Sequence, residues 1–218
     1  MKKIIVIGSG GHAKSLVDTI EKRGEYEIVG CVVNDGVEWK EGISCPIVGN
    51  DDDLEELFAQ GIRYAAVGIG YLGKENPRRR LYMRLKEIGF ELPVICDYSA
   101  IISDRAEIGE GSFVGKGAVV NAGAKIGRCC IINTGAIVEH DCRIGDFSHI
   151  SVSAILCGSV EVEEDCFIGA NATVIQNRRI GSQCIVGAGE TVKDNLEKRM
   201  KYKTQRDEKI IRGGIELT

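Results

Sequence analysis

The side chains best suited to acid–base chemistry are two histidines in the second half of the chain, His140 and His149. An amine or hydroxyl that attacks a thioester must lose a proton, and a neutral imidazole with a pKa near ~6.5 can accept that proton around pH 7. Asp141 or Glu139, the neighbours of His140, could orient its ring and stabilise the protonated form. These residues predict general-base catalysis of acyl transfer, and a structural role for either histidine is the alternative.

Acyl transfer from a thioester also needs hydrogen-bond donors for the oxyanion that develops on the carbonyl. Backbone N–H groups at tight corners suit this task, and Gly158 is the candidate in this sequence. A nucleophilic cysteine is the competing interpretation, with Cys142 two residues after His140. Cys142 falls, however, at a position that the repeat described next keeps for small inward side chains. We therefore favour direct transfer over a covalent acyl-enzyme.

A six-residue repeat must position these groups. An aliphatic residue recurs at every sixth position from Ile102 to Val192, sixteen positions in all, usually with a small residue two positions earlier. No helix would keep residues six positions apart on one face. Short strands separated by corners, in contrast, would turn all of them inward. Glycine or asparagine tolerates the backbone angles of such corners. The repeat therefore predicts an all-β solenoid over residues 98–193.

The phase of the repeat predicts which side chains are buried. His140 and His149 both lie outside the inward register, so we expect both imidazoles on the outer surface of the solenoid. Four of the nine cysteines share the small inward phase, namely Cys130, Cys142, Cys166 and Cys184. We interpret them as buried apolar residues rather than thiol catalysts or metal ligands. Because the chain has no C-x-x-C spacing and no recognisable export signal, no disulfide is predicted.

Residues 1–97 lack the repeat and read as alternating strands and helices, which is typical of a small α/β domain with a parallel sheet. The pattern predicts strands at 4–7, 28–33, 64–67 and 93–96 and helices at 12–23, 51–60 and 77–88. A turn between the first strand and the first helix carries Gly8, Gly10 and Ala13 in the spacing G-x-G-x-x-A. Such turns let a phosphate approach the backbone and the helix N-terminus.

The size of this domain limits the ligand. A dinucleotide fold needs two mononucleotide halves, and fewer than 100 residues supply about one. We therefore expect a nucleoside diphosphate, such as a nucleotide sugar, rather than NAD. Asn34 and Asp35, just after the second predicted strand, would lie at the same sheet edge and could bind ligand hydroxyls or amines; a solvated loop is the alternative.

Composition narrows the class of partner. The formal charge of −4 comes with no large basic segment, so nucleic acid is not an expected partner. No run approaches the ~18 consecutive apolar residues that span a bilayer, and the first apolar run ends at Gly8, too soon for a signal peptide. We expect a cytoplasmic protein that binds small molecules.

Over about 190 residues the chain resembles bacterial sugar acetyltransferases of the hexapeptide-repeat superfamily, specifically the family of UDP-4-amino-sugar N-acetyltransferases and sialic acid O-acetyltransferases. The resemblance rests on the turn at Gly10, Gly11 and His12, on Asp35 and Gly70, and above all on the stretch from Asn133-Thr134-Gly135 to His149-Ile150-Ser151. It implies a left-handed parallel β-helix with three hexads per coil, preceded by a Rossmann-like half-domain. Sixteen hexads then make roughly five coils, about 25 Å long at ~4.8 Å per strand.

The resemblance also implies roles. His140 would be the general base, Asp141 would raise its basicity, and His149, Gly158 and Ala170 would contact acetyl-CoA. Five residues of the first domain would hold the sugar nucleotide, namely Gly10, Gly11, His12, Asp35 and Gly70. The family implies no metal, and it implies a homotrimer with active sites between subunits.

One departure from the family concerns the end of the solenoid. Where many members have a Gly-Asn-Pro-Ala-Lys segment near the coenzyme's nucleotide, this chain has Asp194-Asn195-Leu196-Glu197-Lys198-Arg199. The sequence therefore does not indicate how the adenosine is held, and we expect residues 194–218 to form a capping helix and an exposed tail.

Three other functions compete with N-acetylation of a nucleotide-linked sugar. O-acetylation of sialic acid or another sugar is the nearest, and a first domain that binds no nucleotide would favour it. A zinc carbonic anhydrase would need three imidazole ligands, but the predicted solenoid has two histidines. A non-catalytic trimeric nucleotide-binding scaffold would keep the repeat and have no use for His140.

Overall fold

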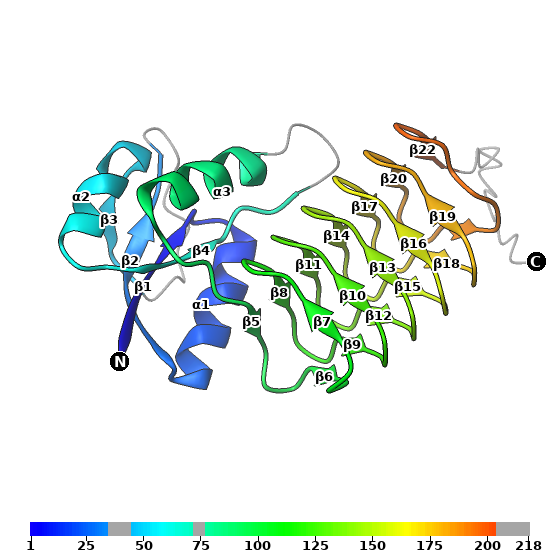
Figure 1. The fold of residues 1–218 in the computed structure, drawn as a ribbon, viewed down its shortest axis with the longest axis horizontal. Helices are drawn as coiled ribbons and strands as arrows, with labels where there is room; N and C mark the ends of the chain where they lie inside the picture. Colours follow the sequence, from blue (N-terminus) through cyan, green and yellow to red (C-terminus); the bar gives the residue numbers. More distant parts are fainter. Residues whose placement is uncertain (35–44, 72–76, 204–218) are drawn as a thin grey trace, which may run out of the picture.

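The computed structural model describes residues 1–34, 45–71 and 77–203 and shows an α/β domain packed against a left-handed parallel β-helix (Figure 1). The first domain has a four-stranded parallel sheet in the order β3-β2-β1-β4. Its strands are β1 (Lys2–Ile7), β2 (Tyr26–Val32), β3 (Ile47–Gly49) and β4 (Tyr64–Val67), and its helices are α1 (Gly11–Arg23), α2 (Leu54–Ala59) and α3 (Pro77–Ile88).

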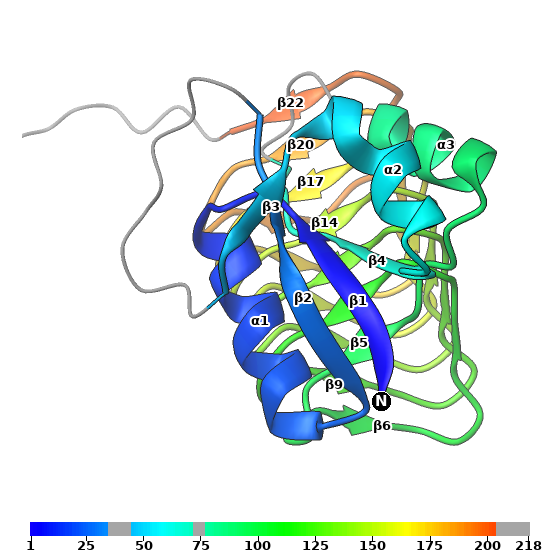
Figure 2. The ribbon, with the colours of Figure 1, turned by 90° about the vertical axis from the view of Figure 1, so that its left-hand side faces the viewer.

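Helices cover both faces of this sheet because its central strand is apolar on both sides. Ile4 of β1 packs in one core with Leu16 of α1. Ile5, which points the opposite way, packs in a second core with Leu54 of α2 and Leu81 of α3. Figure 2 shows α1 on one side of the sheet and α2 and α3 on the other.

The predicted elements of this domain form, with three differences. The short edge strand β3 was not predicted. The helix predicted from residue 51 begins as a 3-10 turn at Asp51–Asp53, capped by the Asn50 side chain, and becomes α-helical at Leu54. The strand predicted at 93–96 is the two-residue strand β5 (Ile95–Cys96), and it pairs with the solenoid rather than closing the first sheet.

The solenoid has three hexads per coil, because all its paired strands except the last pair are eighteen residues apart along the chain, as Ile131 and His149 are. Its strands form three sheets. The seven-stranded sheet contains β5, β8 (Phe113–Val114), β11 (Ile131–Ile132), β14 (His149–Ile150), β17 (Phe167–Ile168), β20 (Ile185–Val186) and β22 (Lys201–Tyr202). The six-stranded sheet contains β6 (Ile101–Ile102), β9 (Val119–Val120), β12 (Ile137–Val138), β15 (Ile155–Leu156), β18 (Thr173–Val174) and β21 (Thr191–Val192). The five-stranded sheet contains β7 (Glu107–Ile108), β10 (Lys125–Ile126), β13 (Arg143–Ile144), β16 (Glu161–Val162) and β19 (Arg179–Ile180).

The interior of the prism confirms the repeat. From Val114 onward every aliphatic residue of the six-residue series is buried in one continuous core. The predicted small residues lie beside them, and Cys130, Cys142, Cys166 and Cys184 are all fully buried. Corners are made by residues with positive φ, among them Asn177 with a φ of 56°.

The three outer faces of the prism differ in chemistry. The seven-stranded sheet presents Phe113 and Ile131, which the first domain buries. The six-stranded sheet presents an apolar face, defined here by Ile101, Val119, Ile137 and Ile155, and Ile101 is 67% exposed. The five-stranded sheet presents a charged face, defined by Glu107, Lys125, Arg143, Glu161 and Arg179.

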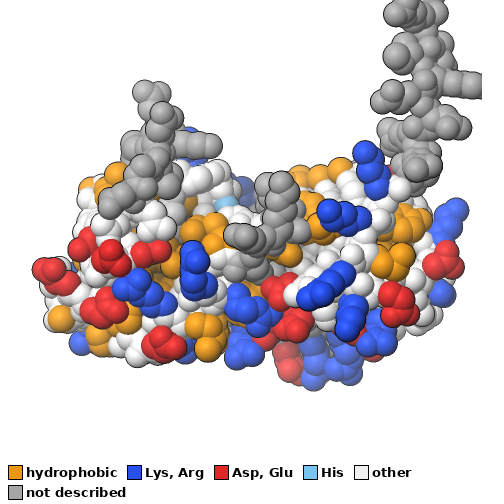
Figure 3. Space-filling model, turned by 90° about the horizontal axis from the view of Figure 1, so that it is seen from above, with side chains coloured by type: hydrophobic (Ala, Val, Ile, Leu, Met, Phe, Trp, Pro, Cys, Tyr) orange, Lys and Arg blue, Asp and Glu red, His pale blue; other side chains and the backbone are white. Residues whose placement is uncertain are grey.

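Polar contacts fix the first domain to the solenoid. Arg78 of α3 is 1% exposed, and its guanidinium donates to the carbonyl of Val67, the last residue of β4, at 3.0 Å and to that of Cys129 at a solenoid corner at 2.9 Å. Beside it, Arg79 forms ion pairs with Glu164 and Asp165. Figure 3 views this side of the molecule and shows Lys and Arg side chains lying beside Asp and Glu side chains. These hydrogen bonds and ion pairs connect the two domains along α3.

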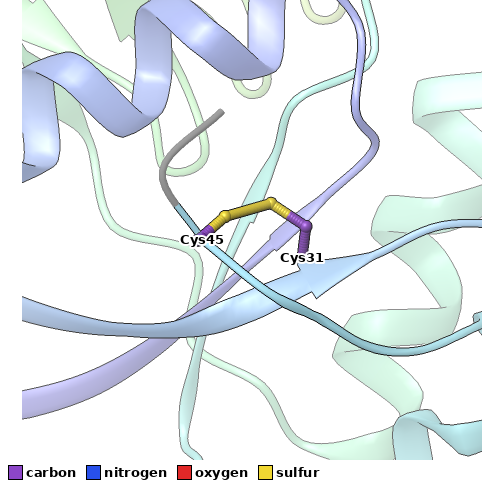
Figure 4. The surroundings of a disulfide bond; sticks show 2 residues. All are labelled: Cys31 and Cys45. Atoms are coloured by element: carbon purple, nitrogen blue, oxygen red, sulfur yellow. A yellow bond between two sulfur atoms is a disulfide. The ribbon is translucent and has the colours of Figure 1, made fainter. Parts of the chain in front are cut away.

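The C-terminal segment and one cysteine pair differ from expectation. Residues 194–203 form no capping helix: Leu196 bridges to Ile180, and β22 pairs with β20, so the solenoid continues. The rest of the predicted tail, residues 204–218, lies outside the described residues. Cys31 of β2 and Cys45 form a disulfide (Figure 4), which spacing alone did not reveal.

Candidate active site

His140 lies at the corner between β12 and β13, where the six-stranded sheet meets the five-stranded sheet. Its side chain is 60% exposed, as predicted from the phase of the repeat. The Nδ1 atom lies 2.9 Å from Oδ2 of Asp141, whose own backbone has a φ of 59°. A carboxylate on Nδ1 leaves Nε2 as the atom that can accept a proton from a substrate.

Two glycines on the neighbouring coils make room for this pair. A Cβ atom at Gly158 would lie 2.5 Å from the Nε2 atom of His140, and one at Gly123 would lie 2.6 Å from Oδ1 of Asp141. Any side chain at either position would displace the pair. Gly158, predicted as an oxyanion donor, therefore lies directly against the proton-accepting nitrogen.

The structure distinguishes between the two acids that flank His140. Glu139 accepts hydrogen bonds from the Asn121 amide and from the backbone N–H of His140, so its carboxylate does not bind the ring. Asp141 does, and this hydrogen bond is the main cause that raises the pKa of His140 above its usual value. The raised pKa makes the neutral ring a stronger base.

His149 is not on the surface, and that prediction was wrong. It points outward from β14 as the register requires, but the first domain covers it, and the residue is 6% exposed. Its Nδ1 lies 2.7 Å from the carbonyl oxygen of Tyr71, and its Nε2 lies 3.1 Å from Nδ2 of Asn133. The Phe167 ring packs edge-on at 5.3 Å. Burial lowers the pKa of His149 to about 4, so the ring is neutral at pH 7.

One chain does not bring the two histidines together. They are nine residues apart, half of an eighteen-residue coil, and so lie on opposite sides of the prism. Gly158 lies beside His140, whereas Ala170 is half-buried at the corner after β17, on the side of His149. The residues predicted to contact acetyl-CoA are thus divided between two edges of the solenoid.

The first domain contains a cavity of about 260 Å³ at the carboxyl ends of its strands. It is lined by Ile7, Gly8, Ser9, Gly10, Val32, Val33, Asn34, Asp51, Gly68 and Ile69. The α1 helix starts beside it, with Gly10 as N-cap, no capping side chain and no acidic residue in the first turn. Free N–H groups at such a start attract a phosphate. Position and chemistry therefore suit a nucleotide.

Of the other predicted sugar-nucleotide residues, Gly11, His12 and Gly70 directly follow residues that line this cavity, and Asp35 is outside the described residues. Gly11 is the exposed first residue of α1. His12 packs edge-on against Phe113, and Gly70 lies close to its Cβ atom. Among the described residues, the buried Nε2 of His12 and Oγ of Ser9 have no hydrogen-bond partner in the chain, so a ligand could supply one.

Sequence reasoning missed three residues at these sites. Asn133 was noted only as part of a motif, yet its amide bonds to His149. Asp51 lines the cavity, although its sequence context indicated only a helix start. No local signal marked Tyr71, because its contacts depend on how the two domains pack.

Other chemistries find little support in the described residues. Cys142 is fully buried, and burial raises the pKa of its thiol to about 11, which argues against a nucleophilic role. No cluster of His, Cys, Asp or Glu side chains in the described part could hold a metal ion. Within the same residues, no helix is long and apolar enough to cross a membrane.

Both domains of the chain match known protein families. The PglD N-terminal domain family matches residues 3–85, and the hexapeptide repeat of succinyl-transferase family matches residues 105–139 and 159–193. A search of curated proteins finds no match.

Solved structures match both domains together. A histidine-to-alanine variant of GDP-perosamine N-acetyltransferase from Caulobacter crescentus, in complex with CoA and GDP-perosamine, is 34% identical with a TM-score of 0.85, over 92% of this chain and 93% of that one. The acetyltransferase domain of PglB from Neisseria gonorrhoeae, in complex with acetyl coenzyme A, is 32% identical with a TM-score of 0.82, over 92% and 95%. WeeI from Acinetobacter baumannii, 20% identical with a TM-score of 0.71 over 92% and 96%, shares the fold.

Proposed function

The chain belongs to the sugar acetyltransferase family of the hexapeptide-repeat superfamily and is an acetyl-CoA-dependent acyltransferase, and from this we propose that it acetylates the amine of a nucleotide-linked amino sugar. The observation that carries the proposal is the exposed His140 ring with Asp141 on Nδ1 and a glycine against Nε2. Acetyl-CoA is the second substrate.

In the proposed reaction His140 removes a proton from the sugar amine while the nitrogen attacks the thioester carbonyl. The C–N bond forms, the C–S bond breaks, and the proton held on Nε2 passes to the departing CoA thiolate. Asp141 stabilises the imidazolium that exists between these steps. The N–H of Gly158 is the proposed donor to the oxyanion, because Gly158 lies against the same ring. No covalent acyl-enzyme is needed.

We propose that the cavity beside α1 holds the nucleotide and that the nucleotide is UDP, as in the 4-amino-sugar enzymes that the sequence resembles. The unpartnered Ser9 hydroxyl and His12 Nε2 support a polar ligand at this place. The Caulobacter enzyme was crystallised with GDP-perosamine, so GDP is the direct competitor. If the acceptor were instead a free sugar that is acetylated on oxygen, this cavity would have no role.

We further propose that the protein is a homotrimer with its active sites between subunits. Two observations support this. The apolar face, with Ile101 at 67% exposure, is a surface that a second copy would cover. In addition, His140 lies on the opposite side of the prism from His149 and the nucleotide cavity of its own chain, so a complete site needs residues from two chains.

The test is an acceptor panel. The protein is incubated with acetyl-CoA and with UDP-linked or GDP-linked 4-amino sugars, free sialic acid or no acceptor, and thiol release is followed together with the mass of the sugar product. Acetylation of a nucleotide-linked amine that falls at least ~10²-fold in His140→Ala is the expected result. Turnover of free sialic acid alone, or a fully active His140→Ala variant, would contradict the proposal.

A further inference from the structure

We propose that Tyr71 is a positioning residue, which holds the His149 imidazole in one tautomer and connects that ring to the nucleotide cavity. The inference rests on the proposed function of the two sites. It begins from the segment Gly68–Tyr71, which follows β4 and is the part of the first domain that lies over β14.

Tyr71 bonds to two consecutive coils of the solenoid. Its carbonyl oxygen lies 2.7 Å from Nδ1 of His149, and its hydroxyl donates to the carbonyl of Asp165 at 2.8 Å. The residue is 5% exposed, and burial is the main cause that raises the pKa of its phenol to about 12. Both ends of the residue are therefore fixed, and the hydroxyl remains a donor at any physiological pH.

These contacts assign the protons of the ring. A carbonyl can only accept, so Nδ1 of His149 carries the hydrogen and Nε2 is an acceptor, which matches the donor Nδ2 of Asn133 at 3.1 Å. Oδ1 of Asn133 in turn accepts the N–H of Thr134 at 2.8 Å. If Nε2 carried the hydrogen instead, two donors would face each other. The Tyr71 carbonyl therefore sets the orientation of a ring and an amide at the proposed coenzyme site.

The same segment forms part of the cavity wall. Gly68 and Ile69 line the cavity, and the carbonyl of Ile69 accepts a hydrogen bond from the buried guanidinium of Arg78 at 2.5 Å. A nucleotide packed against Gly68 and Ile69 would therefore favour the same backbone arrangement that places the Tyr71 carbonyl on His149. Two ligands that favour the same arrangement of one segment bind cooperatively, each raising the affinity of the other by the same factor.

Two tyrosine variants separate this role from general support of the domain junction. Tyr71→Phe removes the hydroxyl bonded to Asp165 and releases one end of the residue. Tyr82→Phe is the matched control, because its hydroxyl also crosses the junction, to Glu110 at 2.6 Å, without touching His149 or the cavity. Both are made in the full chain, and thermal unfolding compares their stability.

The first readout is the nitrogen spectrum of the protein labelled with ¹⁵N-histidine, in which the chain's three histidines are assigned by single substitutions. We expect the Nδ1–H tautomer alone for His149 in the wild type and in Tyr82→Phe, and a mixture of tautomers in Tyr71→Phe. The second readout is calorimetry of CoA with and without saturating UDP, and with GDP in parallel. We expect nucleotide to tighten CoA binding about tenfold in the wild type and in Tyr82→Phe, and less than about threefold in Tyr71→Phe.

Each result decides a separate point. An Nε2–H tautomer in the wild type, or an unchanged spectrum in Tyr71→Phe, overturns the positioning role. A changed tautomer with full cooperativity overturns the link to the cavity. CoA binding that is insensitive to His149→Asn refutes the proposed coenzyme contact, and nucleotides that do not bind at all refute the proposed nucleotide cavity; in both cases the nitrogen spectra still decide the role of Tyr71.

Discussion

The pKa of His140 is raised mainly by its hydrogen bond to Asp141, and the nearby charge of Glu139 adds a smaller contribution. Because the ring must be neutral to accept a proton, kcat/KM should rise with pH as the ring loses its own proton. Asp141 raises the pKa of His140, so Asp141→Asn should move this rise to lower pH. The maximal rate should also fall, by roughly tenfold or more, because a less basic ring is a poorer proton acceptor.

A pH series of kcat/KM for the wild type and Asp141→Asn checks this prediction. Glu139→Gln serves as the control, because the Glu139 carboxylate binds the backbone N–H of His140 and the Asn121 amide rather than the ring. A rise that moves to higher pH in Asp141→Asn, or that moves equally in both variants, would show that Asp141 does not hold the ring during catalysis.

Gly158 lies on the neighbouring coil, directly against the His140 ring. A Cβ at this position would lie 2.5 Å from Nε2 of His140, so Gly158→Ala should push the ring aside and lower kcat at least ~10-fold. The double variant with His140→Ala tests the cause. If displacement of the ring explains the loss, Gly158→Ala should cost almost nothing further when the ring is already absent. Fully additive losses would assign Gly158 an effect independent of His140.

At the scale of elements, periodicity predicted what repeats and missed what depends on packing between domains. The six-residue period predicted the strands of the solenoid, and it placed His140 at a corner outside the inward register, where the ring is exposed. His149 obeys the same register, but the domain that covers it is unrelated to the repeat. The strand β5 was assigned to the wrong sheet for a similar reason: two apolar residues do not reveal their partner.

The disulfide between Cys31 and Cys45 is an element-level feature that joins β2 to the start of β3. Their separation of 14 residues closes a loop whose cross-link stabilises a fold by roughly 3 kcal/mol in the chain-entropy account. Reduction should therefore lower the melting temperature of the wild type by several degrees. Differential scanning calorimetry with and without a thiol reductant measures this shift. A Cys31→Ala variant should melt at the same temperature in both conditions, and a wild type indifferent to reductant would rule out a stabilising cross-link.

At the scale of the whole molecule, each face of the prism has a different use. The first domain packs against the seven-stranded sheet, and the charged face carries ion pairs such as that between Lys125 and Glu107. The apolar face has no partner in the described chain. In the proposed homotrimer the apolar face would be the contact surface, and three copies would close around a threefold axis. His140 stands at the edge of the apolar face, so association would bring it toward a neighbouring chain.

Mixed oligomers test this arrangement directly. If each site combines His140 of one chain with the His149 side of another, then His140→Ala and His149→Asn chains should restore activity when unfolded together and refolded in equal amounts. A site is intact when one chain supplies His140 and its neighbour supplies His149. At random mixing each of these two conditions holds for half of the chains, so about a quarter of all sites are intact. Refolded mixtures should thus recover about a quarter of wild-type kcat per chain. The control mixes His140→Ala with Asp141→Ala, two changes on the same edge of the same chain, and should show no more activity than the average of the two variants alone, because no site then has both residues. Equal recovery in the two mixtures, or none in the first, would contradict a site shared between chains. The shared site is expected because a single chain holds its two histidines on opposite sides of the prism.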